Sequence, residues 1–331
     1  MSLFNVYGYR VRLTGDAQYA KEAVTSDFQH FLQDGDGPAH VAELLDRDPP
    51  YDSAPAGVAS VYTPRNVAYT VGGRSFIDYG GRGLAVYDRS AGGVTIYSRD
   101  QDLLYEACYL FLLSRIAEYL DKRRMHRVHA LALAYNGKAV LVLLPMGGGK
   151  STLGSALLRF PELDFLSDDS PFVSADGIVH AFPLRLGLLP GNENGIPAQY
   201  LRRIERMEFG PKIVVSSEYY AGRIRDSVVP GLIFLGRRSL SRDCRIEPAG
   251  AYDGLKSMMA NCVVGLGLFQ GMEFVFQHSL LEIAAKAGTA VSRLRASRRL
   301  LSRSEVYHLT LGRDYQRNAD TVREFVHRKL S

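Results

Sequence analysis

One stretch of the sequence has residue types and a spacing that can bind phosphate. Residues 141–152 read LVLLPMGGGKST, an apolar run that leads into Gly147, Gly148 and Gly149. Glycine has no Cβ, so such a loop can adopt positive φ angles and turn its N–H groups around an anion, and a following helix adds its N-terminal dipole. Lys150 is placed to reach the β and γ phosphates, and Ser151 to ligate Mg²⁺. The stretch predicts a phosphate-binding loop.

The start of this loop departs from the usual pattern. That pattern has a glycine five residues before the last one, and this chain has Leu144 there, followed by Pro145 and Met146. The alternative interpretation is a glycine-rich turn between a strand and a helix, with an ordinary lysine at the helix start. An apolar strand before the loop and an amphipathic segment at 153–160 after it favour phosphate binding.

Two adjacent acids follow the loop. Asp168 and Asp169 come after one predicted helix and one apolar strand that begins near Phe165. The end of such a strand can return beside the loop, at the sheet edge where ligands bind. Adjacent side chains of an extended segment point opposite ways, so one aspartate could hold the metal while the other faces an acceptor; both could reach the site if the strand has already turned. The alternative is a polar turn at a strand end, which Pro171 favours.

These groups suit the transfer of a phosphoryl group. That reaction needs alignment, neutralised phosphate charge and a group that takes the proton of an acceptor hydroxyl, and Lys150, Mg²⁺ and one aspartate supply all three. His129 could donate to phosphate oxygens or modulate the proton affinity of an aspartate, but a lone histidine at a strand end is as a rule structural. Its position leaves both roles open. The basic residues Arg185, Arg237 and Arg238 are further candidates for phosphate contacts, each more often structural or solvated.

The elements that must position this site read as mixed α/β. Apolar runs at 128–135 and 138–144 are joined by Asn136-Gly137, a strong hairpin signal, so the loop is expected to follow a strand with an antiparallel neighbour. A second hairpin is predicted at 172–182, around Asp176-Gly177. Further predicted strands lie at 212–215, 231–235 and 306–311, and helices at 252–261, 280–287 and 321–329.

The first third of the chain reads as a separate α+β module. Alternating residues over 7–13 predict a strand, and a short helix is expected around His40 to Leu45. Five β-prone runs within 58–97 predict an antiparallel meander, and a helix is expected over 100–120. We place the domain boundary after this helix, giving an N-terminal α+β module at 1–122 and a catalytic domain at 123–331.

Composition limits the classes of protein. A chain of 331 residues with 46% apolar and 23% charged residues predicts a soluble globular protein, and three scattered cysteines fit a reducing cytoplasm. No signal peptide and no membrane span are expected, because the longest apolar run is short. The net charge of +5 comes from local basic clusters that are more often solvated helix faces, so no nucleic-acid partner is expected. A homo-oligomer is left open.

Taken together, these motifs resemble the C-terminal domain of HPr kinase/phosphorylase. That family has a histidine before its first hairpin strand, a Gly-x-Gly-Lys-Ser loop and an Asp-Asp pair after the next strand, and the chain matches this order over 127–242. The resemblance implies a P-loop kinase domain of the phosphoenolpyruvate-carboxykinase-like type. It implies that ATP binds residues 147–152, including Thr152, that Ser151 and one aspartate bind Mg²⁺, and that the other aspartate is the base. His129 becomes a residue that contacts phosphate or supports those that do.

Three departures separate the chain from the enzyme itself. The family has a glutamate where this chain has Thr152, and a loop glycine where it has Leu144; the family's C-terminal segment rich in Arg, Asn and Glu has no counterpart. The chain therefore resembles the HPr-kinase-like proteins found beside genes for modified peptides, including kinases that phosphorylate the C-terminal serine of lasso peptide precursors.

The expected function is an ATP- and Mg²⁺-dependent kinase that transfers the γ-phosphate to a hydroxyl, in the first place a serine of a peptide or protein. Two alternatives stay open. One is a nucleotide-binding regulatory or scaffold protein, and the other is a small-molecule kinase. Arginines that converge opposite the loop in a closed pocket would favour a small-molecule acceptor.

Overall fold

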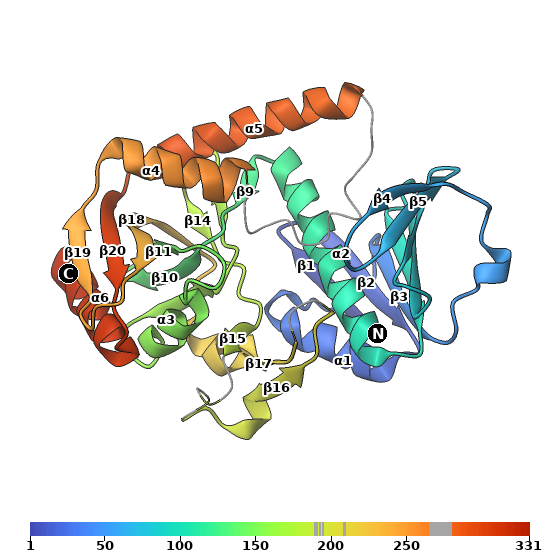
Figure 1. The fold of residues 1–331 in the computed structure, drawn as a ribbon, viewed down its shortest axis with the longest axis horizontal. Helices are drawn as coiled ribbons and strands as arrows, with labels where there is room; N and C mark the ends of the chain where they lie inside the picture. Colours follow the sequence, from blue (N-terminus) through green and yellow to red (C-terminus); the bar gives the residue numbers. More distant parts are fainter. Residues whose placement is uncertain (189–190, 192, 194, 208–209, 265–279) are drawn as a thin grey trace. The chain divides into compact units, whose positions relative to one another are not determined.

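The computed structural model describes residues 1–188, 191, 193, 195–207, 210–264 and 280–331. The chain divides into two compact units. The first takes in Met1–Tyr119 with 203–207 and 210–212, and the second takes in Leu120–Arg202 with 213–264 and 280–331. Each unit is a mixture of helices and sheets with both parallel and antiparallel strand pairs, which confirms the mixed α/β class (Figure 1).

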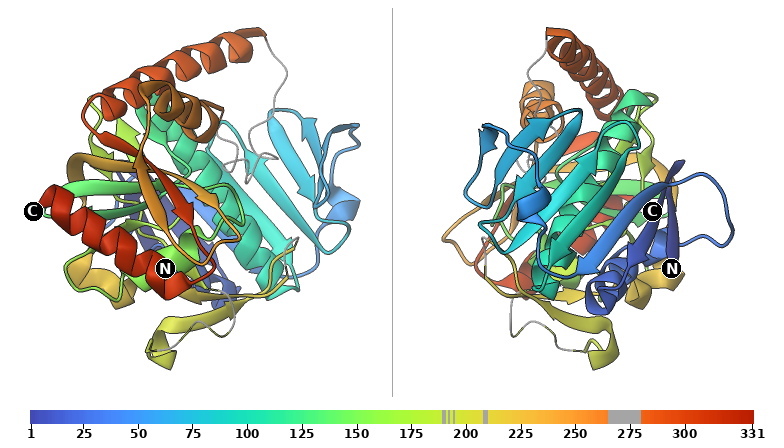
Figure 2. Two further views of the ribbon diagram at one scale, coloured as in Figure 1. Left: turned by 60° about the vertical axis from the view of Figure 1, so that its left-hand side comes forward. Right: turned by 90° about the vertical axis from the view of Figure 1, so that its right-hand side faces the viewer.

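The first unit is built on an eight-stranded mixed sheet in the order β1-β2-β3-β8-β7-β6-β5-β4, which curls into a half-barrel (Figure 2). Strands β2, β3 and β8 are parallel neighbours, and the remaining pairs are antiparallel. The strands are β1 (Ser2–Val6), β2 (Tyr9–Gly15), β3 (His40–Asp46), β4 (Ala59–Tyr62), β5 (Val67–Val71), β6 (Arg74–Asp78), β7 (Gly83–Asp88) and β8 (Gly93–Ser98). The helices are α1 (Gln18–Asp27), η1 (Gln29–Phe31), η2 (Tyr51–Ser53) and α2 (Gln101–Lys122).

The predicted five-stranded meander and the long helix after it are both confirmed. Strands β4 to β8 pair antiparallel in chain order. Helix α2 packs on the sheet, where Phe111 meets Tyr87 of β7 edge to face, and the Tyr105 hydroxyl donates to the buried carboxylate of Asp27 in α1. Its apolar residues have little or no exposed surface, which explains why this segment reads as a buried helix.

The prediction of a short helix around His40 to Leu45 is wrong. This segment is strand β3, which pairs in parallel with β2 on one side and with β8 on the other. Within β3, Ala42 and Leu44 are fully buried, whereas Val41 is exposed. Such alternation of buried and exposed residues is typical of a strand. Pairing on both sides outweighs the weak helix propensity of this short run. The strand predicted from Tyr7 begins at Tyr9, because Tyr7 and Gly8 form the turn with positive φ that joins it to β1.

The second unit contains a nine-stranded mixed sheet. Its main path is β12-β10-β11-β18-β14-β13-β9, and β20 pairs with β18 and β19. Its strands are β9 (Met125–Arg127), β10 (Leu131–Tyr135), β11 (Lys138–Leu143), β12 (Asp164–Ser167), β13 (Phe172–Ser174), β14 (Val179–His180), β18 (Ser227–Arg238), β19 (Arg245–Pro248) and β20 (Glu305–Leu311). A three-stranded sheet has the order β15 (Leu186–Leu188), β17 (Lys212–Val215) and β16 (Leu201–Ile204).

Helices cover both faces of the central strands β10, β11 and β18. Successive residues of β10 and β11 point to opposite faces. One set, including Leu133 and Val142, packs with α3 and α6, and the other set, including Ala132 and Leu141, packs with α4 and α5 (Figure 1). The helices of this unit are α3 (Lys150–Leu157), η3 (Ala198–Tyr200), η4 (Ser217–Arg223), α4 (Ala251–Met258), the π-helix η5 (Met259–Val264), α5 (Leu280–Leu301) and α6 (Tyr315–Leu330). Burial on both faces explains why these strands read as continuous apolar runs.

The predicted hairpins of this unit are confirmed. Strands β10 and β11 pair antiparallel around Asn136 and Gly137, which both have positive φ, and β13 and β14 pair around Gly177. The predicted strands at 212–215, 231–235 and 306–311 correspond to β17, part of β18 and β20, and the three predicted helices correspond to α4, α5 and α6. Among the described residues, no helix combines the length and apolar character that a membrane crossing requires.

A buried polar network ties α5 to the end of α2 within the second unit. Asp121 accepts hydrogen bonds from both Nη2 and Nε of Arg293 at 2.6 and 3.2 Å, and its Oδ1 lies 2.7 Å from His126 Nδ1. His126 Nε2 lies 2.8 Å from the Ser292 hydroxyl. The order Ser-His-Asp is that of a nucleophilic triad. However, His126 has no exposed surface, and Arg293 also binds the Asp121 carboxylate. The network therefore has a structural role.

Removal of this carboxylate should destabilise the second unit. Desolvation raises the pKa of Asp121, but the hydrogen bonds and charges of His126 and Arg293 outweigh it and hold the pKa below its usual value. We expect Asp121→Asn to lower the free energy of unfolding by about 3 kcal/mol at pH 7, because it leaves buried partners unmatched. The measurement is urea denaturation of both proteins.

The pH dependence has a defined sign. A carboxyl with a depressed pKa contributes stability above its unfolded pKa of about 4 and loses it as the pH falls through the folded value. The difference in the free energy of unfolding between wild type and Asp121→Asn should therefore stay constant from pH 8 to 5 and become smaller below about pH 4. The control is Asp243→Asn, whose ion pair with Arg317 is more than half exposed and should be worth under about 1 kcal/mol. Equal effects of the two substitutions would contradict the assignment.

Candidate active site

The glycine loop has the conformation that its sequence predicts. Gly147 and Gly149 have φ of 73° and 96°, and Gly149 is the N-cap of α3. At Gly148 the backbone angle is ordinary, but a Cβ would lie 2.9 Å from the carbonyl oxygen of Pro145. Two glycines are thus required by backbone angle and the third by close approach, and the loop leads from β11 into the N-terminus of α3.

The side chain of Leu144 fits at this position because Gly236, on the adjacent strand, has no side chain. Its side chain is 1% exposed and belongs to the core on the α3 and α6 side of the sheet. A Cβ on Gly236 of the adjacent strand β18 would lie 2.5 Å from the Leu144 side chain. The carbonyl oxygen of Leu144 accepts a 3.0 Å hydrogen bond from Lys150 Nζ. Leucine at this position therefore supports the lysine through its backbone and the core through its side chain.

Lys150 is a buried cation that lies among three partners. Its Nζ is 2.8 Å from His129 Nε2 and 3.5 Å from Asp169 Oδ1, in addition to the bond to Leu144. His129 Nε2 is itself 3.0 Å from the same Asp169 oxygen, so ammonium, imidazole and carboxylate form a triangle. The backbone places the last two side by side, since Ala130 N–H donates to the Asp169 carbonyl. Lys150 and His129 are 7% and 3% exposed.

The charge of Asp169 follows from these neighbours. Desolvation raises the pKa of its carboxyl, but the hydrogen bond with His129 and the positive charges of His129, Lys150 and Arg127 outweigh it and hold the pKa below its usual value. The carboxylate is therefore ionised at neutral pH. Its side chain keeps 44% of its surface exposed, in contrast to its two buried partners. Asp169 is the member of the triangle that a molecule in solution can approach.

Asp168 lies against Ser151, the residue that follows Lys150. The Ser151 hydroxyl donates a 2.9 Å hydrogen bond to Asp168 Oδ2, which also accepts from the backbone N–H of Gly187 in β15. Strand β12 ends at Ser167, so neither aspartate belongs to it, and the alternation of an extended strand does not separate them. Both aspartates thus reach the loop, one at Ser151 and one at Lys150.

The sheet order explains this convergence. Strands β11 and β12 both pair antiparallel with β10, so they run in the same direction with β10 between them. The loop leaves the end of β11 and the aspartates leave the end of β12, so both lie at one edge of the sheet. The oxygen donors of Ser151 and Asp168 are of the kind that Mg²⁺ prefers. Within the described ranges, no three His, Cys, Asp or Glu side chains converge in a metal-binding cluster.

Three further residues were predicted for the loop or for phosphate contacts, namely Thr152, Arg185 and Arg237. Thr152 is the third residue of α3 and is half-buried, and its carbonyl accepts from the Ser155 hydroxyl. Arg185 is half-buried just before β15. Arg237 donates to the Thr310 hydroxyl on β20.

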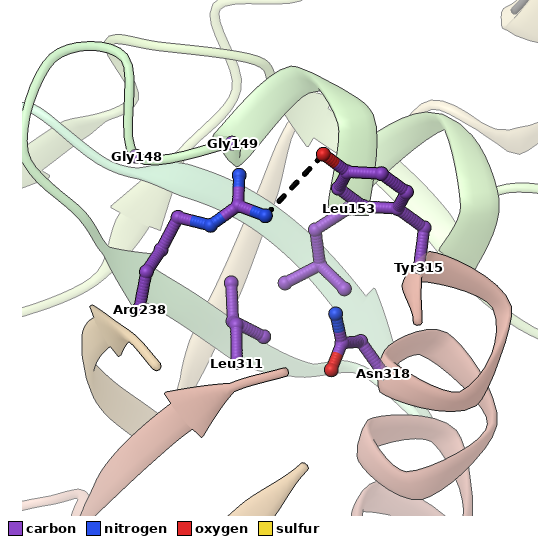
Figure 3. Close-up of a pocket in the computed structure, with 7 residues that line it drawn as sticks. All are labelled: Gly148, Gly149, Leu153, Arg238, Leu311, Tyr315 and Asn318. Carbon is purple, nitrogen blue, oxygen red and sulfur yellow. Dashed lines mark hydrogen bonds between the residues drawn. The ribbon is translucent and has the colours of Figure 1, made fainter. Parts of the chain in front are cut away.

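Arg238 borders a small pocket beside the loop, which combines the predicted Gly148 and Gly149 with residues that the sequence did not single out. Its Nη1 lies 3.5 Å from where a Cβ on Gly149 would be, and its Nη2 lies 3.3 Å from the Tyr315 hydroxyl (Figure 3). The lining consists of Gly148, Gly149, Leu153, Arg238, Leu311, Tyr315 and Asn318. Tyr315 carries no motif, and it reaches the loop only because α6 packs on α3. This contact between distant segments left no signal in the sequence.

Comparison of the chain with known protein families and with curated proteins finds no match.

The loop geometry predicts that a methyl group added at Gly147 affects ligand binding separately from its effect on stability. Gly147 and Gly137 both have φ of 73°, and an added Cβ at either would meet nothing within 4 Å. We expect Gly147→Ala and Gly137→Ala to cost the same stability, about 1 kcal/mol each, from backbone strain. Only Gly147→Ala should weaken the binding of pyrophosphate, about tenfold, because it tilts the N–H groups of the loop.

Urea denaturation and isothermal titration calorimetry measure the two effects. If both variants lost pyrophosphate affinity equally, the loss would come from reduced stability and not from a change in the loop.

Proposed function

We propose that this protein is an ATP- and Mg²⁺-dependent kinase that transfers the γ-phosphate to a hydroxyl group. The observation that carries the proposal is the pairing of each loop side chain with its own aspartate, Ser151 with Asp168 and Lys150 with Asp169. A phosphate loop alone fits any nucleotide-binding protein. A second, exposed carboxylate at the lysine supports a role in transfer, because phosphoryl transfer needs a group that accepts the proton of the attacking hydroxyl.

We assign metal binding to Ser151 and Asp168. A P-loop serine and an acid at the end of a neighbouring strand are the groups that hold Mg²⁺ in P-loop enzymes, and here they already touch. The Gly187 N–H fixes the same carboxylate oxygen and so orients it toward the serine. When bound, Mg²⁺ would neutralise phosphate charge and align the phosphates.

We assign the base to Asp169. The proton of the acceptor hydroxyl would pass to its carboxylate as the new O–P bond forms and the bond to the leaving ADP breaks. Lys150 would contact the β and γ phosphates, which compete with Asp169 for its ammonium group and thereby release the carboxylate toward the acceptor. His129, whose Nε2 lies 3.0 Å from Asp169 Oδ1 and 2.8 Å from Lys150 Nζ, would hold the two side chains in position.

The fold type and the acceptor belong to the same proposal. The order of a hairpin, a glycine loop, a helix and a strand that returns beside the loop supports a P-loop domain of the HPr kinase and phosphoenolpyruvate-carboxykinase type. A serine on a peptide or protein is the acceptor that this resemblance implies. The 44% exposure of Asp169 is compatible with such a bulky acceptor.

Substitution of the two aspartates tests this function. The protein would be incubated with γ-labelled ATP, Mg²⁺ and serine-containing peptides encoded beside its gene, and the label located by mass spectrometry. We expect Asp169→Asn to lower the transfer rate at least about a hundredfold with ADP affinity retained, because it removes the base. Asp168→Asn should raise the Mg²⁺ concentration needed for half-maximal activity.

The control is Asp164→Asn, at the start of β12, whose carboxylate pairs with the exposed Arg225; this variant should leave the rate unchanged. Wild-type rates in both the Asp168 and Asp169 variants would exclude the mechanism.

A further inference from the structure

A group of exposed arginines lies at the same edge of the sheet as the glycine loop. Strands β11, β18 and β20 are parallel neighbours, so the loop after β11 and the segments that follow β18 and β20 emerge at one edge. The first of these arginines, Arg238, lies beside Gly149 of the loop (Figure 3). The arginine surface, as we call this group, consists of Arg238, Arg242, Arg313 and Arg317.

The arginine surface keeps an excess of positive charge. Asp314 Oδ2 lies 3.6 Å from Arg242 Nε, and Asp243 Oδ1 lies 2.9 Å from Arg317 Nη1, so two of the arginines have a carboxylate partner. Arg238 donates to an uncharged tyrosine hydroxyl. Among the residues that the structure describes, neither Arg238 nor Arg313 forms an ion pair. Two guanidinium groups beside the site are therefore available to an acidic partner.

Backbone hydrogen bonds hold the two segments of the arginine surface together. The Ser239 N–H donates to the Leu311 carbonyl at 2.9 Å, and the Arg313 N–H donates to the Ser241 carbonyl at 2.9 Å. The loop after β18 is thus fixed against the turn that leads from β20 into α6. A surface that is already arranged binds its partner at a lower entropic cost.

From this arrangement we infer that the arginine surface binds acidic residues of the acceptor peptide and so holds the acceptor hydroxyl near the loop. The inference rests on the proposed function, because it names the class of peptide that the same site would phosphorylate. The phosphates of the nucleotide already have the loop N–H groups, Lys150 and Mg²⁺ in the proposed site, so further cations beside it suit a second, acidic partner. The guanidinium group binds a carboxylate through two parallel hydrogen bonds.

The composition of the arginine surface favours a peptide over other acidic partners. Its arginines are exposed and do not enclose a pocket, which suits an extended acceptor better than a small molecule. Asp243 and Asp314 lie within the surface and would repel the continuous phosphate backbone of a nucleic acid. Leu240, between Arg238 and Arg242 in the chain, is 89% exposed and can contact an apolar side chain of a peptide.

The test compares two fluorescein-labelled peptides of equal length by fluorescence anisotropy. Both have a central serine, which is flanked by aspartates in one peptide and by asparagines in the other. We expect wild type to bind the aspartate peptide about tenfold more tightly at low ionic strength, because each carboxylate can pair with an exposed guanidinium. The difference should become smaller as salt is added, because salt screens exposed charges.

Variants of the arginine surface test whether it is the binding site. The double variant Arg242→Gln/Arg313→Gln removes two charges and should weaken the aspartate peptide about fivefold, with the asparagine peptide unchanged. Arg242→Lys/Arg313→Lys keeps both charges and should bind the aspartate peptide more tightly than the glutamine variant does. The control is Arg328→Gln, an exposed arginine in the last turn of α6 and roughly 16 Å along the helix axis from Arg317, which should change neither affinity.

The outcomes separate this inference from the proposed function. If wild type binds both peptides equally, or the glutamine variant keeps the full preference, the inference is wrong, and the transfer assay with the two aspartate variants still decides the proposed function. If oligothymidylate binds more tightly than the aspartate peptide and displaces it, the surface binds nucleic acid, which also overturns the inference. If the aspartate peptide binds at the arginines but both aspartate variants keep the wild-type transfer rate, the inference stands and the proposed function fails.

Discussion

The site depends on one buried positive charge. The ammonium group of Lys150 lies in the interior beside a core of leucine and valine, where an unpaired charge is costly. Its partners come from three separate places, the carbonyl of Leu144 just after β11, His129 before the hairpin and Asp169 after β12. The sheet must therefore hold β12, β10 and β11 in this order for the lysine to remain buried. Stability and site geometry depend on the same contacts, so a change that loosens one is expected to loosen the other.

Local features of the site could be predicted from the sequence, because short-range chemistry decides them. Asn136-Gly137 requires a tight turn with positive φ, and the glycines before Lys-Ser allow the positive φ that Gly147 and Gly149 adopt in the loop. Strand β3 could not be recognised, because its identity comes from parallel neighbours on both sides and not from its own residues. Tyr315 was missed for a similar reason, since only the packing of α6 brings it near Gly149. The limit lies where a residue's role is set by a partner distant in sequence.

The residue at which β12 ends determines whether the side chains of Asp168 and Asp169 point to the same side or to opposite sides. If β12 continued through Asp169, the two carboxylates would point to opposite faces of the sheet and one would leave the site. The strand instead ends at Ser167, and the Ser167 hydroxyl accepts from the Ser170 N–H in the turn that follows. A strand end is the least predictable part of an element, since a hydrogen bond or two fixes it. This boundary is what gives the serine and the lysine of the loop one carboxylate each.

The packing of Leu144 against Gly236 has a consequence for how such a loop can change during evolution. Leu144 follows the end of β11 and Gly236 lies on the neighbouring strand β18, and the space for the leucine side chain exists because Gly236 lacks a side chain. A lineage that exchanges the loop glycine for leucine must already carry a glycine on the neighbouring strand, whereas the reverse order passes through a clash. Once leucine fills the space, its replacement by glycine would leave a cavity in the core, so such an exchange is hard to reverse. A motif defined along the loop alone would overlook such chains, although a pattern spanning both strands would retain them.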